Sequence, residues 1–233
     1  MRYQRGQVKE KEWIPKTDLG RKVKSGEITD IDDIIGKGIK ITEAEIVDFL
    51  LPDLESDFLL IGQAKGKAGG GKRIIVRKTQ KVTTEKPRPK FSALAVVGNG
   101  KGYVGMGIGA SNEALPAREK ALTKAKKNLI KIKLGCGSWE CWCGTPHSIP
   151  FKINGRESSV RMSLMPAPKG SGLVITDECK KVVKMAGVKD IWSKTTGQTS
   201  TRINLIRACF KAFKQLSEMK IKEDFHKKAG IVD

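Results

Sequence analysis

The sequence predicts a two-domain α+β protein with one strongly basic half. At 233 residues the chain is long enough for two small domains, each with a modest core. The hydrophobic period alternates between helix-like and strand-like stretches in two successive blocks. The formal charge is +20, yet residues 1–60 carry a net charge of −3 and residues 61–233 a net charge of +23. A domain this basic is typical of proteins that bind a polyanion, although a highly soluble surface is the simpler alternative.

Residues 1–41 are predicted to form a polar N-terminal arm with one short helix. The arm is basic and has little periodicity up to about residue 26, which indicates an extended segment that becomes ordered on its partner. Thr29 opens a helix that stops at Gly36.

Residues 42–133 are predicted to form the first domain. Thr42 and Glu45 form a capping box before an apolar helix that Pro52 ends. The stretch KRIIVRK reads as one strand, a polar stretch runs to Lys90, and FSALAVV and YVGMGI form strands around the turn at 98–102. A helix follows with Pro116 in its first position and an apolar face of Ala117, Ala121, Ala125 and Leu129. The order α-β-β-β-α is that of a double-stranded-RNA-binding-like domain, which recognises RNA mainly by shape.

Residues 134–147, rich in Cys and Trp, form the predicted linker to a second domain at 148–220. IPFKI is expected to end in a hairpin turn at Asn154-Gly155, before the strand VRMSLMPA. A helix near 177–186 that Gly187 stops, the strand DIWSK and a last helix at 199–220 complete a β-β-α-β-α unit. The third strand requires a crossover connection. Residues 221–233 form a polar tail.

Two glycine patterns imitate nucleotide sites without meeting their requirements. Gly66, Gly71 and Lys72 match a phosphate loop, but Arg73 stands where that loop needs Ser or Thr for magnesium, and a strand follows instead of a helix. The G-x-G-x-x-G pattern at 100–105 lies in a hairpin turn, whereas a dinucleotide fold needs it to open a helix. A hairpin whose backbone approaches RNA is the better interpretation.

Eight of the candidate RNA-binding residues lie within residues 72–90, around one probable loop, where an ordinary solvated loop is the alternative. A phosphate seat is also predicted at SKTTGQTST, where simple capping of the next helix by Thr199 or Ser200 is equally consistent. The predicted RNA-binding set consists of Lys72, Arg73, Arg77, Lys78, Lys81, Lys86, Arg88, Lys90, Lys101, Lys169, Lys194 and Arg202.

Four soft donors fall within twelve residues in the linker. Cys136, Cys141, Cys143 and His147 give C-x4-C-x-C-x3-H, enough for one tetrahedral zinc, although the spacing is not that of a standard knuckle. Buried free thiols or a plain surface loop are the alternatives. Trp139 and Trp142 are suited to packing or to stacking on bases, and the remaining cysteines, 179 and 209, fit helical core positions. No cofactor other than this candidate zinc is expected.

Several classes of function lack support in the sequence. His226 is the only other histidine, and no Ser/His/Asp or Cys/His/Asn set can be assembled, so we expect no enzyme and no small-molecule substrate. No apolar run approaches the length of a membrane helix, and the N-terminus lacks a signal-peptide core. With five cysteines, an odd number, we expect a cytoplasmic protein with reduced thiols and no membrane partner.

The residues resemble a known family. FSALAVVGNGKGYVGMGIG with AREKALTKAKKNLI, then GTPHSIPFKINGRESSVRMSLMPAPKGSGLV and AGVKDIWSKTTGQTSTRINLIRACFKAF, resemble the universal small-subunit ribosomal protein five family. EWIPKTDLGRKVKSGEI and GCGSWECWCG are similar to its archaeal-type branch. The resemblance runs from about Trp13 to Leu216, while the stretch at 62–90 is longer and richer in Gly and Lys than the family pattern.

This resemblance implies a structural constituent of the small ribosomal subunit. Its N-terminal domain would be double-stranded-RNA-binding-like and its C-terminal domain of the family's own second-domain fold. The implied partners are small-subunit ribosomal RNA and ribosomal proteins four and eight, near the messenger RNA entrance, where the family influences translational accuracy. The loop before Phe91 would touch RNA, and the surface around Arg118 would face protein four. A free regulator that binds double-stranded RNA and a nucleotide-driven enzyme are the alternatives.

Overall fold

The structure, a computed structural model, describes residues 13–64, 71–141 and 143–231, which fall into two compact units divided after Pro52. The first unit contains three short helices, α1 (Asp18–Lys24), α2 (Ile31–Gly36) and α3 (Glu45–Leu50). The Thr17 side chain caps α1 by accepting from the Gly20 amide. The predicted arm is thus helical from Asp18, and its first twelve residues lie outside the described part of the chain.

The Glu43 carboxylate connects the segment before α3 to the segment before α1 within the first unit. Glu43 accepts hydrogen bonds from the Trp13 indole at 2.9 Å and from the Lys16 and Thr17 amides at 2.9 and 2.7 Å. Burial alone would raise the pKa of Glu43, but these hydrogen bonds outweigh it and lower the pKa. The capping box predicted at Thr42 is wrong, because the amides of Val47 and Asp48 bond to the Ala44 carbonyl and α3 begins only at Glu45.

The second unit begins with an antiparallel sheet. Its strands are β1 (Glu55–Phe58), β4 (Arg77–Lys81), β5 (Arg88–Gly98), β6 (Tyr103–Ser111) and β7 (Leu129–Lys131). The order is β1-β5-β6-β7, and β4 pairs with the first half of β5. KRIIVRK is not one strand as predicted. Its first part, β3 (Arg73–Ile74), pairs with β2 (Gly62–Gln63), and the chain changes partner around the buried Val76 before β4 begins.

Helix α4 (Ala114–Lys127) packs on one face of this sheet at unusually close range. A Cβ added to Gly107 would lie 2.2 Å from the Ala125 nitrogen, and one added to Gly109 would lie 2.1 Å from the Ala117 carbonyl oxygen. The predicted alanine face is therefore the contact face. The helix starts two residues earlier than predicted, so Pro116 occupies its first turn, where its missing N–H costs nothing, and Leu129 belongs to β7.

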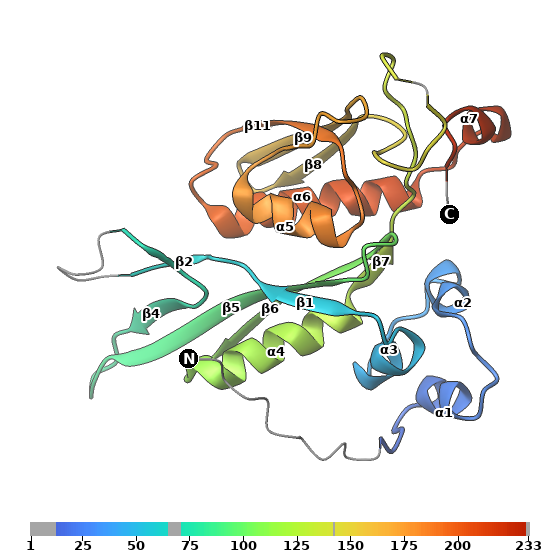
Figure 1. Cartoon of the computed structure of the whole chain (residues 1–233). Helices are drawn as coiled ribbons and strands as arrows, with labels where there is room; N and C mark the ends of the chain where they lie inside the picture. Colours follow the sequence, from blue (N-terminus) through green and yellow to red (C-terminus); the bar gives the residue numbers. More distant parts are fainter. Residues whose placement is uncertain (1–12, 65–70, 142, 232–233) are drawn as a thin grey trace, which may run out of the picture. The chain divides into compact units, whose positions relative to one another are not determined.

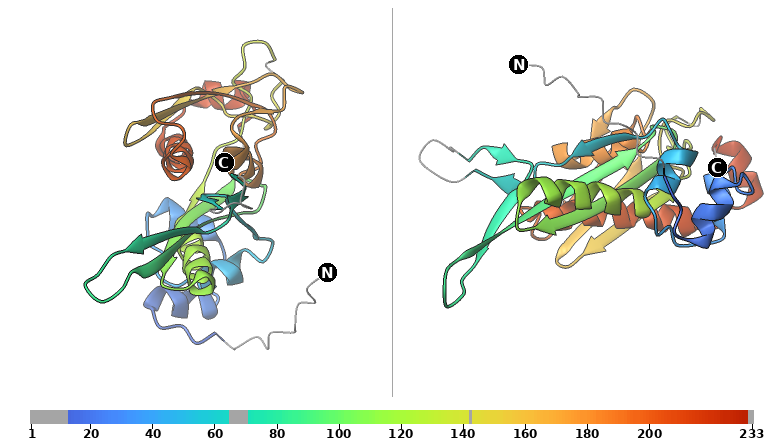
Figure 2. Two further views of the ribbon diagram at one scale, coloured as in Figure 1. Left: turned by 90° about the vertical axis from the view of Figure 1, so that its left-hand side faces the viewer. Right: turned by 90° about the horizontal axis from the view of Figure 1, so that it is seen from below.

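The opposite face of the sheet forms the core with two further helices. Val104 and Met106 alternate with the glycines of β6 and join a cluster with α5 (Asp177–Met185) and α6 (Arg202–Glu218). These helices lie between the first sheet and a second one, with α4 on the far side of the first sheet (Figures 1 and 2). The short helix α7 (Glu223–Lys228) follows. None of the helices within the described ranges is both long and apolar enough to span a membrane.

The second sheet has the order β10-β11-β9-β8. Its strands are β8 (Ile153–Glu157), β9 (Val160–Pro166), β10 (Leu173–Val174) and β11 (Ile191–Thr196). β10 and β11 are parallel and α5 connects them, which supplies the predicted crossover. The hairpin turn predicted at Asn154-Gly155 is wrong, because β8 continues through it to Glu157 and the positive φ of 55° belongs to Ser158. Gly155 instead lets α6 approach.

Candidate nucleic-acid interface

The β4–β5 hairpin carries half of the predicted RNA-binding residues, and all six on it are exposed, namely Arg77, Lys78, Lys81, Lys86, Arg88 and Lys90. Lys81 lies directly opposite Arg88, and Thr79 opposite Lys90. Directly opposed residues project from the same face of a sheet, and alternation adds Arg77 to that face. Four basic side chains therefore share one face of a two-stranded ribbon.

Like charges on this face repel each other in the isolated chain. The Lys81–Arg88 pair stands directly across the strands, a placement that destabilises a hairpin. Glu85 is the only acidic residue between 71 and 90, and its carboxylate lies 3.4 Å from the Arg88 guanidinium with both side chains exposed. An exposed pair of this kind contributes little. A polyanion laid along the ribbon would remove the repulsion.

The other face of the hairpin borders an apolar groove of about 500 Å³. The Lys78 ammonium lies 5.8 Å from the centre of the Phe91 ring, and the Arg118 side chain from α4 reaches the same groove. Arg118 Nε is buried and has no hydrogen-bond partner among the described residues. The groove is lined by Leu60, Arg73, Ile74, Ile75, Val76, Lys78, Phe91, Ala114 and Arg118.

The glycine turn between β5 and β6 contacts protein rather than presenting a free backbone. The amides of Gly100 and Gly102 donate to the carbonyl oxygens of Met185 and Ala186, at the end of α5. These bonds satisfy carbonyl groups that a helix end leaves without partners. These two amides are therefore not available to RNA, while approach of the turn to RNA stays a prediction. The exposed Lys101 side chain lies 3.8 Å from the exposed Asp53.

The remaining predicted RNA-binding residues lie apart from the hairpin. Lys72 and Arg73 are exposed ahead of β4, and Lys169 and Lys194 are exposed on the second sheet and its loop. The guanidinium of Arg202 bonds to Glu178, which is 4% exposed, so its charge is neutralised within the chain. The helix it begins, α6, has Thr201 at its N-cap without a side-chain capping bond, so the predicted caps Thr199 and Ser200 are not used.

A second basic surface escaped the sequence analysis. Register places Arg156 opposite Arg161, and alternation puts Lys152 on the same face, which Lys194 shares through its pairing with Ser163. All four basic side chains are exposed, whereas the alternate residues of these strands face α6. Period-two alternation of charge in this stretch was the signal that could have identified it.

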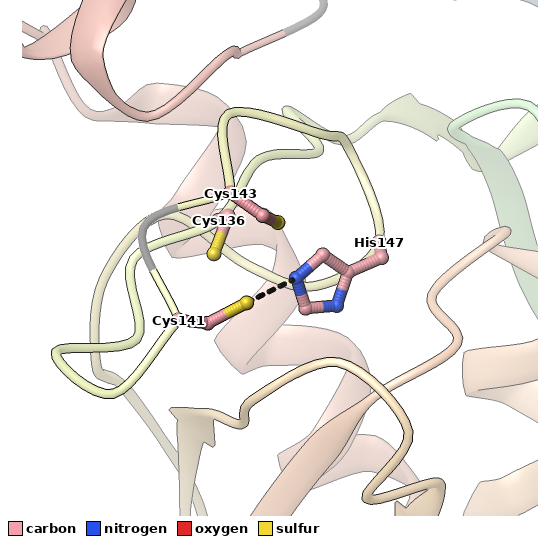
Figure 3. Close-up of side chains that lie close together, drawn as sticks. All are labelled: Cys136, Cys141, Cys143 and His147. Atoms are coloured by element: carbon pink, nitrogen blue, oxygen red, sulfur yellow. Dashed lines mark hydrogen bonds between the residues drawn. The ribbon is translucent and has the colours of Figure 1, made fainter.

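The cysteine-rich linker forms the most compact group of donors in the described chain. One donor atom from each of Cys136, Cys141, Cys143 and His147 lies within 4.8 Å of every other (Figure 3). The sulfur of Cys141 lies 4.0 Å from His147 Nε2. Burial raises the pKa of Cys136, whereas a hydrogen bond with the Thr145 hydroxyl lowers the pKa of Cys143 to about 6.

The other aromatic and sulfur residues of the linker and core behave differently. Trp139 is 79% exposed, so it does not pack into the protein, and Trp142 lies outside the described residues. Cys179 and Cys209 are fully buried in the core as predicted. A hydrogen bond with Cys179, together with burial, raises the pKa of Cys209 well above its usual value.

Comparison with known proteins bears on both halves of the second unit. The family model of the ribosomal protein S5 N-terminal domain matches residues 61–133, and that of the ribosomal protein S5 C-terminal domain matches residues 155–228. These matches confirm the predicted two-domain α+β architecture, with a double-stranded-RNA-binding-like domain followed by the family's second domain.

Curated relatives cover nearly the whole chain. The small ribosomal subunit protein uS5 of Nanoarchaeum equitans is 46% identical over 222 residues, which is 95% of each chain. That of Methanocaldococcus jannaschii is 47% identical over 222 residues, again 95% of each chain. That of Methanosphaera stadtmanae is 46% identical over 221 residues, or 95% of this chain and 91% of the relative. The predicted archaeal-type resemblance is confirmed, and the chain belongs to the ribosomal protein S5 family, a family of structural, non-enzymatic proteins.

Proposed function

We propose that this chain is a structural protein of the small ribosomal subunit that holds folded ribosomal RNA through its basic β4–β5 hairpin. Family membership supports the first part. The observation that carries the second is the shared face of Arg77, Lys81, Arg88 and Lys90, on which like charges lie directly opposed. Neutralising phosphates with such a ribbon releases condensed counterions and yields a salt-dependent affinity.

The proposed contacts are to phosphates rather than to base edges. A two-stranded ribbon of Lys and Arg can follow an RNA backbone, and the rigid sheet behind it fixes the register of the contact. Exposed Lys169 and Lys194, together with Arg156 and Arg161, would extend the contact over the second sheet. Lys72, Arg73, Lys78, Lys86 and Lys101 would add charge around the hairpin, whereas Arg202 would contribute least because Glu178 already binds it.

Charge reversal on the hairpin tests the RNA proposal. Replacing both Lys81 and Arg88 with glutamate should weaken binding to purified small-subunit ribosomal RNA about tenfold or more and should reduce the dependence of affinity on salt. The matched control reverses Lys37 and Lys40, which are exposed in the first unit and change the net charge equally. Equal affinities and salt slopes for the hairpin variant and the native chain would remove the hairpin from the interface.

Sedimentation of cell extract distinguishes a ribosomal protein from a free regulator. In sucrose gradients of cell extract, the native chain should sediment with small subunits and whole ribosomes and remain there as salt rises. A chain that returns to the top of the gradient at moderate salt, and that binds generic duplex RNA as tightly as ribosomal RNA, would favour the regulator.

We also infer that the neighbouring proteins in the subunit are ribosomal proteins four and eight, close to the messenger RNA entrance. The groove around Arg118 is apolar with one unsatisfied buried N–H, a surface that a protein side chain with an oxygen acceptor would complete. A photo-crosslinking residue at Leu115, which is 65% exposed on α4, should capture protein four in intact subunits. Capture of RNA alone would assign the groove to RNA. If the position near the entrance is right, the hairpin variant should also raise misreading of a reporter codon.

A further inference from the structure

The linker brings four metal-binding groups together within a segment of twelve residues. Three of them are thiols and the fourth is an imidazole, and their donor atoms all lie within 4.8 Å of one another. Ligands of a tetrahedral zinc with bonds of about 2.0 to 2.3 Å stand roughly 3.5 to 3.8 Å apart. A contraction of about 1 Å or less, by rotation of side chains on a loop, would close the observed group around an ion.

The histidine is already held in the orientation that a metal ligand requires. His147 Nδ1 lies 2.8 Å from Asp190 Oδ2, and both side chains are buried. Nδ1–H donates a hydrogen bond to the carboxylate, so the lone pair of Nε2 faces the Cys141 sulfur (Figure 3). A carboxylate behind the ligating histidine is the usual outer support of a zinc site.

The carboxylate is itself fixed by the backbone. Oδ1 of Asp190 accepts hydrogen bonds from the amides of Gly170 and Gly172, at 3.1 and 2.8 Å. The two oxygens of Asp190 thus have separate roles: Oδ1 binds the loop that follows β9, and Oδ2 binds the histidine. This division indicates an organised support rather than a chance contact.

Simple burial of free thiols accounts for the cluster less well. The two core cysteines, 179 and 209, lie on helices among apolar side chains and are fully buried. In the linker, by contrast, Cys143 is exposed and Trp139 is 79% exposed, so apolar packing does not explain why the donors converge. A bound ion would.

We propose that Cys136, Cys141, Cys143 and His147 bind one structural Zn²⁺, with Asp190 as the residue that positions His147. Three thiolates and one imidazole in a tetrahedral set are the ligands that zinc selects over magnesium or calcium. Four protein ligands leave no open position for a substrate, so the ion has a structural role. This inference is independent of the proposed contact with RNA.

The ion would connect the linker to three other segments of the second unit. The linker carries the ligands, and Asp190 connects them to the start of β11 and to the loop at 168–172. The Cys136 amide donates to the Ala229 carbonyl, which ties the C-terminal segment after α7 to the same site. Loss of zinc should therefore loosen the linker and the C-terminal segment together.

Metal analysis of the full chain tests the proposal. The protein, purified and washed with a weak chelator, should hold one zinc per chain by elemental mass spectrometry. Substituting cobalt should give the visible absorption of a tetrahedral ion with sulfur ligands. The double variant Cys141→Ser with Cys143→Ser should lose the ion, whereas Cys179→Ala, which changes a thiol outside the cluster, should retain it. Asp190→Asn should retain a tetrahedral cobalt spectrum while binding zinc about 10- to 100-fold more weakly.

Three results would overturn the proposal. The first is a native chain, folded by circular dichroism, that takes up no stoichiometric zinc when supplied with it. The second is zinc that survives in the double cysteine variant, because the ion would then lie elsewhere. The third is an iron–sulfur absorption spectrum in place of zinc.

Discussion

Glu157, at the end of β8, lies 2.6 Å from the Lys211 ammonium and 3.2 Å from the Arg207 guanidinium, both on α6. The hydrogen bond and charge of Lys211, followed by the charge of Arg207, lower the pKa of Glu157. The contact therefore joins the second sheet to its helix and depends on pH.

Replacing Glu157 with glutamine should destabilise the chain by about 1 kcal/mol at neutral pH, since both basic partners are partly exposed. A carboxylate with a lowered folded-state pKa stabilises the fold above its unfolded pKa of about 4.3, and this stabilisation is lost as pH falls through the folded value. The difference in the free energy of unfolding between the native chain and the variant, measured with urea, should therefore shrink below about pH 4.3. Glu119→Gln, at an exposed position of α4, should show no such trend, and a constant difference for Glu157→Gln down to pH 3 would contradict the assignment.

Gly155 is expected to tolerate no larger residue. An added Cβ would lie 1.9 Å from the Ala208 carbonyl oxygen and 2.8 Å from the Ala212 nitrogen, so the helix backbone would have to move. Gly155→Ala should lower the free energy of unfolding by about 1 to 3 kcal/mol. Gly36→Ala, where a Cβ meets open space, is the control and should be neutral or slightly stabilising. Equal stability of the two variants would show that the sheet and α6 are not so closely packed.

Asp190 should matter even when no metal is bound. Asparagine has one acceptor oxygen, so it can serve His147 or the glycine amides but not both, and its NH₂ group would face a donor. In the presence of a strong chelator, Asp190→Asn should cost about 2 kcal/mol of stability. Asp53→Asn, at an exposed carboxylate, should cost far less. A loss no greater than that of the control would argue against the division of roles between the two oxygens.

The five cysteines should differ widely in reactivity. With a chelator present, an alkylating reagent should modify the exposed Cys143 first, and Cys179 and Cys209 only on unfolding. Both core thiols are buried, and the raised pKa of Cys209 keeps it protonated. Peptide mass mapping after a short exposure to the alkylating reagent, with and without urea, gives the order in which the cysteines are modified. Early modification of Cys209 in the folded chain would contradict the described core.

The sequence by itself determined the basic half of the chain, the long helices and the main hairpin. The alanines of α4 and the apolar face of α6 recur with the helical period, and β5 and β6 alternate on either side of a glycine turn. It also brought the four soft donors together, because they lie within twelve residues of one another. Such features are local, so their pattern along the chain is sufficient to identify them.

Only the tertiary structure decided the features that depend on distant partners. Strands of two to four residues, such as β2 and β10, carry too few residues for a period and form because a partner strand supplies their hydrogen bonds. Gly155 was predicted to be a turn residue because the sequence alone does not distinguish a glycine required for a turn from one required for close packing. The support of His147 by Asp190, 43 residues later, was likewise absent from any local pattern. Spacing along a chain records neighbours within an element, whereas folding decides which distant groups meet.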